Sequence, residues 1–202
     1  KKRFGFFPSY AVGYIISNER FWTMSPRLIS LLKLKASYGE IGNDQIGGNR
    51  RFAFNTEMSS GVAGFIWGTK PQVFPNSGGI ATGVPGNDNV SWEKAVKKNL
   101  GLELGFMNSA LTLNLDYFYE KRSGIYILQQ SVPSIVGNNV QQYVNLGRMR
   151  NQGIDASLEF NKQFGDWFVS ARGNFSYNRN KKLYDDAPTP IWGYQSEAGF
   201  AY

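Results

Sequence analysis

Strict alternation of apolar and polar residues between Asn99 and Lys121 constrains the fold of this chain more than any other feature. The segment reads NLGLELGFMNSALTLNLDYFYEK. Side chains of a β-strand point to opposite faces with a period of two, so the pattern predicts two strands, each with one apolar and one polar face. A two-residue turn at Asn108-Ser109 would join the two strands into a hairpin.

The register of this hairpin follows from its turn. Closing the turn places apolar residues opposite apolar residues and polar residues opposite polar residues, and a slip of one residue would destroy that match. The expected pairs are Phe106–Leu111, Leu104–Leu113, Leu102–Leu115 and Leu100–Tyr117 on one face, and Glu103–Asn114, Gly101–Asp116 and Lys97–Glu120 on the other.

A second hairpin, between Gly153 and Asn180, shows the same segregation when it is closed at Gly165-Asp166. Closure places Glu159 opposite Arg172 and Ile154 opposite Tyr177. Two further alternating segments lie nearer the start of the chain. The six strands are expected at residues 3–16, 31–40, 92–107, 110–122, 147–163 and 167–180.

The connections between these strands alternate between short and long. The long ones are expected at about residues 42–91, 123–146 and 181–198. Antiparallel order places all of them at one end of the sheet, as in outer-membrane barrels with an apolar outside and a polar inside. A soluble β-sandwich also alternates, but its strands usually have about five or six residues. The predicted fold is therefore all-β: about six strands of an antiparallel up-and-down transmembrane β-barrel.

Composition excludes several functions. The chain has no cysteine and no histidine, so thiol and imidazole chemistry are absent. The pairs Asp116/Glu120 and Asp155/Glu159 are each about 13 Å apart along a strand, too far for a glycosidase pair. Asp185-Asp186 is interpreted as a solvated loop dipeptide rather than a calcium site. We therefore expect no enzymatic activity, no cofactor and no metal site.

The net charge of +7 permits anionic partners, but Lys and Arg are spread along the sequence and mostly alternate with acids. A clustered basic face would be the expected footprint of a nucleic-acid binder, so nucleic acid is not expected as a partner. No apolar run is long enough for a transmembrane helix. The chain begins within a strand pattern and shows no signal peptide, which suggests a piece of a longer protein.

Candidate functional residues fall into two groups. Charged residues of the polar face are expected to form ion pairs in the barrel lumen, Lys97 with Glu120 and Glu159 with Arg172. The long loops are where barrels place recognition. The candidates there for ligand or partner contact are Trp67, Asn76, Asp88, Asn89, Asn138, Asn139 and Trp192. The tryptophans could stack on a sugar ring and the other residues could bond hydroxyls; the alternative is that they turn or pack the loops.

Four segments resemble successive parts of the SusC/RagA family of TonB-dependent outer-membrane transporters. They are RFGFFPSYAVGYIISNERF (Arg3 to Phe21), LKLKASYGEIGND (Leu32 to Asp44), WEKAVKKNLGLELGFMNSALTLNLDYFYEKRSGI (Trp92 to Ile125) and VNLGRMRNQGIDASLEF (Val144 to Phe160). Their order and spacing also match the family. The resemblance implies part of the carboxy-terminal half of a plugged barrel of about 22 strands.

The resemblance further implies a function and partners. The family imports oligosaccharides or peptides across the outer membrane of Bacteroidetes, with a SusD-like surface lipoprotein above the barrel and the TonB complex acting through a plug domain. Outer-membrane lipid would surround the barrel, and the localisation would be the cell outer membrane. The competing hypothesis is a soluble or cell-surface β-rich binding module that uses its long loops as the site.

Overall fold

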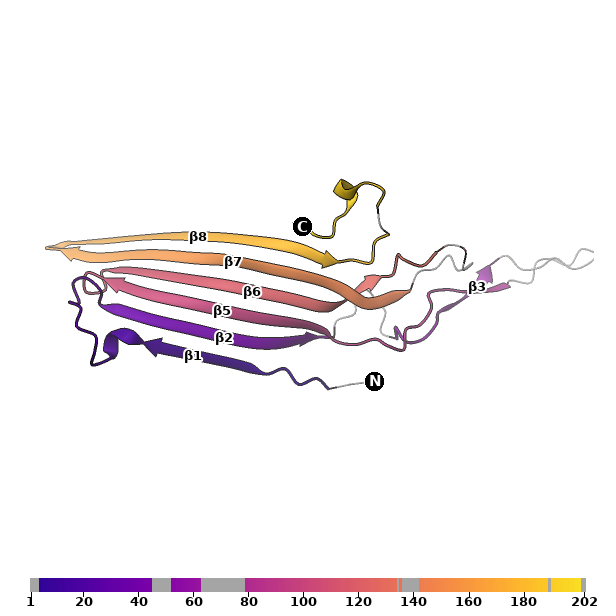
Figure 1. Cartoon of the computed structure of the whole chain (residues 1–202), viewed down its shortest axis with the longest axis horizontal. Helices are drawn as coiled ribbons and strands as arrows, with labels where there is room; N and C mark the ends of the chain where they lie inside the picture. The colour runs from indigo at the N-terminus through magenta and orange to yellow at the C-terminus, as the bar shows by residue number, and fades with distance from the viewer. Residues whose placement is uncertain are drawn as a thin grey trace, which may run out of the picture.

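The computed structural model describes residues 4–44, 52–62, 79–133, 135, 142–188 and 190–200. Six antiparallel strands form one sheet in the order β1-β2-β5-β6-β7-β8 (Figure 1). Their bounds are β1 Ser9–Ile15, β2 Leu31–Asn43, β5 Glu93–Phe106, β6 Leu111–Leu128, β7 Tyr143–Phe164 and β8 Trp167–Tyr184. A separate two-stranded sheet pairs β3 (Met58–Val62) with β4 (Gly79–Thr82), and two short 3-10 turns are η1 (Ile16–Asn18) and η3 (Gly193–Gln195).

The registers predicted for the two hairpins are confirmed. Every expected partner pair of β5 and β6 occurs, from Phe106 opposite Leu111 to Lys97 opposite Glu120. The second hairpin places Glu159 opposite Arg172 and Ile154 opposite Tyr177. The Ala110 amide donates to the Met107 carbonyl at 3.3 Å around the Asn108-Ser109 turn. Asn108 and Ser109 have φ values of 58° and 65°, as a primed hairpin turn requires.

The strand ends differ from the prediction. β6 runs to Leu128 and β7 begins at Tyr143, so both ends of the predicted 123–146 loop are strand. A bulge makes the extension of β6 possible, because Gly124, at φ +69°, interrupts the pairing register between Ser123 and Ile125. The predicted 42–91 loop likewise contains the last residues of β2 and the β3–β4 hairpin. β1 is shorter than predicted and begins after Pro8, which has no amide hydrogen to donate to a ladder.

The sheet is a single layer, and its apolar face is uncovered. Ala95 is the one buried apolar residue in the described part of the chain. Leu158 and Phe175, which a sandwich would bury, are 46% and 64% exposed. The described strands therefore have no second layer to pack against, and the sandwich alternative has no support. β1 and β8 each pair on one side, so the barrel is not closed within this chain.

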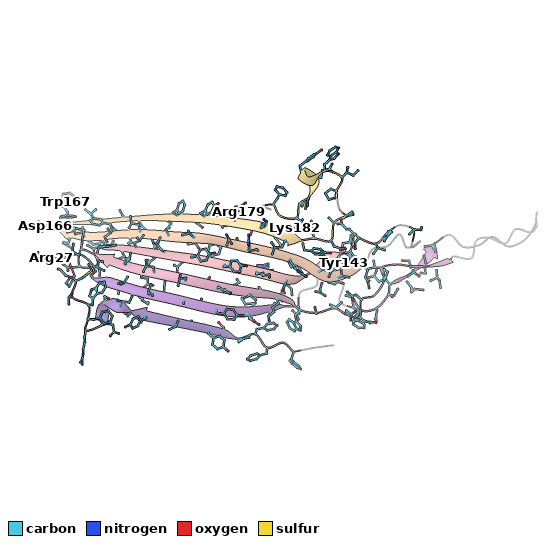
Figure 2. All side chains as sticks on the ribbon, in the orientation of Figure 1. Arg27, Tyr143, Asp166, Trp167, Arg179 and Lys182 are labelled. Carbon is cyan, nitrogen blue, oxygen red and sulfur yellow. The ribbon has the colours of Figure 1, made fainter. Side chains whose placement is uncertain are left out.

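The two ends of the sheet differ as the connection lengths predicted. Arg27 and the Asp166-Trp167 turn lie at one end of the strands, and Tyr143 lies at the other, with the β3–β4 hairpin beyond it (Figures 1 and 2). No helix in the described part of the chain is both long and apolar enough to cross a bilayer.

Candidate functional site

A ladder of charged and polar side chains covers the face of the sheet opposite the apolar one. At its centre, Glu103 on β5 accepts both Lys33 and Lys35 from β2, with Nζ to carboxylate distances of 3.3 and 2.8 Å. Further along the ladder, the Asn114 amide donates to the Ser157 hydroxyl at 3.3 Å. Alternation places these residues on one face, and antiparallel pairing brings their strands together.

Gly101 makes room for an ion pair between two strands that are not neighbours. It lies between Lys35 and Asp116 in the same cross-strand row. A Cβ at this position would lie 2.4 Å from Asp116 Oδ1 and 2.8 Å from Lys35 Cε. With no side chain at Gly101, Lys35 Nζ reaches to 3.7 Å from Asp116 Oδ1. The residues Lys35, Ser37, Asn99, Gly101 and Asp116 help to line a trough of about 450 Å³ on this face.

The two ion pairs predicted on this face differ in the structure. Lys97 Nζ lies 3.4 Å from Glu120 Oε2, and Arg122 also contacts the Glu120 carboxylate. Glu159 and Arg172 are direct register partners, but the Glu159 carboxylate instead accepts the side-chain amide of Asn161 at 2.7 Å. Within the described ranges no ion pair joins Glu159 to Arg172.

At the opposite end from the short turns, Asp186 fastens two loop segments together. Its Oδ2 accepts the Gln130 amide at 3.0 Å and the Ser131 hydroxyl at 3.0 Å, and its Oδ1 accepts the Tyr184 hydroxyl at 2.8 Å. Burial raises the pKa of this carboxyl group, but the hydrogen bonds from Tyr184 and Ser131 outweigh burial and hold the pKa below its usual value.

The expectation of a solvated Asp185-Asp186 dipeptide was wrong for Asp186, which is only 6% exposed. The reason is the set of donors that surrounds it, namely the Gln130 and Ser131 amides and the Ser131 hydroxyl from the segment after β6, and the Tyr184 hydroxyl at the end of β8. No sequence pattern predicts this cluster, because Gln130 and Asp186 are 56 positions apart in the sequence.

A cavity of about 560 Å³ lies beside this cluster, between the loop ends of β6 to β8 and the segment after β8. Lys182 contributes charge to it and pairs with Glu197 and, at 3.5 Å, with Asp185. Other lining residues are Ile125, Ile127, Gln130, Met149, Tyr184, Gln195 and Ser196. The mixture of apolar and polar lining suits binding rather than reaction chemistry.

A second set of side-chain amides attaches the segment before β5 to the start of β7. The Asn145 side chain donates to the Ser91 carbonyl at 3.0 Å and to the Gly124 carbonyl at 2.8 Å, and it accepts the Ser91 amide at 3.0 Å. Asn87, which is 7% exposed, donates to the Tyr143 carbonyl at 2.9 Å. Sequence reasoning missed Asn87 and Asn145, because an asparagine that closes a contact distant in sequence looks like an ordinary turn residue.

Three of the predicted loop candidates lie in the described residues. Asp88 and Asn89 are exposed, and the Asn89 amide donates to the Asn87 side chain at 2.8 Å, which is a turn contact. Trp192 is 60% exposed and lies in the segment after β8. No hydrogen bond or ring contact joins Trp192 to Asp88 or Asn89 in the described part of the chain. Trp67, Asn76, Asn138 and Asn139 lie outside the described residues.

The described residues hold no group of three or more acidic, cysteine or histidine side chains that could bind a metal ion. The candidate site consists of the polar trough with its ion pairs and of the loop-end cavity. Both are open to contact with a solute.

Proteins of known family resemble this chain in sequence and in structure. The chain is 31% identical over 203 residues to TonB-dependent receptor P39 of Formosa agariphila, covering 96% of this chain and 18% of that protein. It is 27% identical to TonB-dependent receptor SusC of Bacteroides thetaiotaomicron, covering 90% of this chain and 18% of that protein. The chain thus spans about a fifth of the length of these relatives.

Solved structures agree with the sequence relatives. A structure of the RagAB peptide transporter superposes with a TM-score of 0.66 at 31% identity, covering 88% of this chain and 18% of that one. The closed-closed state of the RagAB peptide importer gives a TM-score of 0.68 at 30% identity, covering 96% and 20%. The family model described as TonB dependent receptor-like, beta-barrel matches residues 1–199. This chain belongs to the TonB-dependent receptor β-barrel family.

Proposed function

We propose that this chain forms about six strands of the wall of an outer-membrane TonB-dependent transporter. The observation that carries the proposal is the single-layer sheet, whose strands have one apolar, exposed face and one face of paired charges. In water the apolar face would be unfavourable by about 25 cal/mol for each Å² exposed. Against hydrocarbon the same face is stable, and the polar face then lines an aqueous lumen.

Strand length and edges support the same proposal. β2, β5, β6, β7 and β8 have 13 to 22 residues, whereas a tilted strand needs about 9–11 to cross the hydrocarbon core. β1 and β8 present unpaired backbone groups at the sheet edges, which hydrocarbon does not tolerate. Further strands of the same receptor would pair with both edges and close a barrel of about 22 strands.

The aromatic residues support a membrane orientation. Trp167, 79% exposed, lies at the short-turn end (Figure 2). Tyr117 and Tyr177, 44% and 58% exposed, lie toward the loop end in one cross-strand row with Ile154 between them. Two aromatic levels on the apolar face are typical of barrel girdles at the two membrane interfaces. We infer that the short turns face the periplasm and the long loops face outward.

The cargo and partners follow from the relatives. RagAB is a peptide importer and SusC is a TonB-dependent receptor. We propose that the receptor containing this chain imports oligosaccharides or peptides, with a SusD-like surface lipoprotein over the loop end and the TonB complex supplying energy. The loop-end cavity and Trp192 are the candidate contacts for cargo or lipoprotein in the described residues.

The membrane orientation is testable by cysteine labelling, since this chain contributes no cysteine and the unsubstituted receptor gives the background of the remainder. Trp192→Cys at the loop end and Asp166→Cys in the short turn are each introduced into the complete receptor. An impermeant maleimide on intact cells should label the first variant and spare the second, and both should react after the cells are broken. Labelling of Asp166→Cys on intact cells, or release of the receptor by salt without detergent, would contradict the proposal.

Transport requires a separate test. Deletion of the complete receptor should abolish growth on one class of nutrient, glycan or peptide. Complementation with the receptor gene should restore that growth. Affinity purification of the receptor in detergent should retain a surface lipoprotein. Unchanged growth on all glycans and peptides would leave a membrane-embedded barrel without the proposed import function.

A further inference from the structure

Five basic residues lie in two adjacent cross-strand rows on the apolar face of the sheet, toward its loop end. They are Lys98 on β5, Lys121 on β6, Arg150 on β7, and Arg179 and Lys181 on β8. One cross-strand row runs Lys98–Tyr119–Gln152–Arg179, and the next runs Val96–Lys121–Arg150–Lys181. We call these five residues the basic band. Apart from Arg179 and Lys181, their sequence positions are far apart, and the strand pairing brings them together.

The basic band lacks the neutralisation that the opposite face has. On the polar face Lys33, Lys35 and Lys97 each contact a carboxylate. In the described part of the chain, no ion pair involves any residue of the basic band. The outward positions of β5 to β8, which alternate with the paired polar positions, include no aspartate or glutamate. Among the described residues, the outward carboxylate of the neighbouring strand β2, Glu40, contacts Lys94 and no residue of the band.

The band also contains an unfavourable arrangement. Lys121 lies directly opposite Arg150, and Arg150 lies directly opposite Lys181. Like charges in directly opposed cross-strand positions destabilise a sheet. An anion bound across the three strands would remove this repulsion, and three cations spanning about 10 Å can contact it together.

The height of the band on the sheet places it at the membrane boundary. Lys98 and Lys121 are the ninth and eleventh residues from the short-turn ends of β5 and β6, and about 9–11 residues cross the hydrocarbon core. Directly below the band lies the row Leu100–Tyr117–Ile154–Tyr177, and below that Leu102–Leu115–Ala156–Phe175. An amphipathic ligand bound here would therefore contact the cations with its polar group and the apolar side chains with its hydrocarbon chain.

We propose that the basic band binds the phosphate-bearing headgroup of an outer-leaflet lipid, whose acyl chains lie along the apolar rows below it. Charge complementarity selects the phosphate, and continuity with the apolar rows selects a lipid over a free anion. Basic residues beside an anionic lipid surface contribute binding in this way. This inference rests on the proposed function, because it requires the loop end of the apolar face to lie at the outer leaflet.

The test uses the complete receptor in phosphatidylcholine nanodiscs, with lipid A as the probe. Lys121→Gln, Arg150→Gln and Lys181→Gln are combined in one variant. The control combines Arg20→Gln, Arg27→Gln and Lys162→Gln, which removes the same charge near the short-turn end. The band variant should bind lipid A on the order of a hundredfold more weakly than the unsubstituted receptor, with the control unchanged. Inorganic phosphate at the same phosphate concentration should not displace the lipid.

The outcomes separate the two proposals. A band variant that inserts normally but binds lipid A like the control overturns the lipid site and leaves the transporter intact. Displacement by inorganic phosphate also overturns it, since the site would then recognise a free anion. If the band variant fails to insert, a second variant that preserves the charge is used, with Lys121→Arg, Arg150→Lys and Lys181→Arg combined. This variant should insert and bind lipid A. Its failure to bind would overturn the proposal. Absence of the unsubstituted receptor from the membrane would contradict the proposed function itself.

Discussion

Lys35 and Asp116 form an ion pair at 3.7 Å although β5 separates their strands. The contact passes over Gly101, the register partner of both residues. Lys35 also contacts Glu103 at 2.8 Å, so one lysine joins three neighbouring strands on the polar face. The polar face is therefore a connected network rather than a set of isolated pairs, and a glycine is what permits the connection.

Gly101→Ala should weaken this network. The new Cβ would lie 2.4 Å from Asp116 Oδ1, so the carboxylate must move away from Lys35. We expect the free energy of unfolding in detergent to fall by about 0.5–1 kcal/mol relative to Gly173→Ala, the control, whose Cβ would meet no atom within 4 Å. In an Asp116→Ala background the difference should disappear. A difference that persists there would show that the carboxylate is not the cause.

Gly153→Ala should lower the free energy of unfolding more than Gly101→Ala does, because backbone atoms and an aromatic ring surround this position. Its Cβ would lie 2.2 Å from the Tyr177 carbonyl oxygen, 2.6 Å from the Phe118 ring and 2.9 Å from Asn178 Cα. β7 and β8 must separate locally, which we expect to lower the free energy of unfolding by about 1–3 kcal/mol. Chemical denaturation of the complete receptor measures this change, again against Gly173→Ala. Equal stability of the two variants would contradict the close approach.

Asp186 should make stability depend on pH at the loop end. Its pKa is lowered in the folded state, so its contribution is present above the unfolded pKa of about 3.9 and is lost as pH falls through the folded pKa. Asp186→Asn removes the charge but keeps a side chain that tolerates the positive φ of +56° at this position. We expect the variant to be less stable by about 1.5–3 kcal/mol at pH 7, with the difference shrinking by pH 3. A difference independent of pH would exclude the charged form as the reason.

Trp192→Ala should reduce capture of cargo or lipoprotein. This side chain is 60% exposed at the loop end, and an aromatic contact is worth about 0.5–1.5 kcal/mol. The expected effect is a two- to tenfold weaker affinity, measured as uptake of labelled nutrient or retention of the lipoprotein. Trp167→Ala, which removes a still more exposed tryptophan at the short-turn end, should leave both unchanged. Identical results for the two variants would remove Trp192 from the candidate site.

Alternation made much of the sheet predictable. A strict period of two, with a turn of fixed length, left one register in which apolar met apolar, and the pairs from Phe106–Leu111 to Lys97–Glu120 all occur. Strand ends were less predictable. The continuation of β6 past Ser123 depends on a bulge at Gly124 that reverses the alternation, and a local pattern cannot anticipate it.

The sequence by itself determined which residues share a strand and which face each strand presents, because side-chain direction in a β-strand is a local property. Only the tertiary structure decided what those faces contain. Asp186 became a buried junction, Asn145 a link from β7 to the segment before β5, and five cations between Lys98 and Lys181 a single band. These groupings depend on pairing between strands distant in sequence, and that pairing sets the local charge and burial from which function follows.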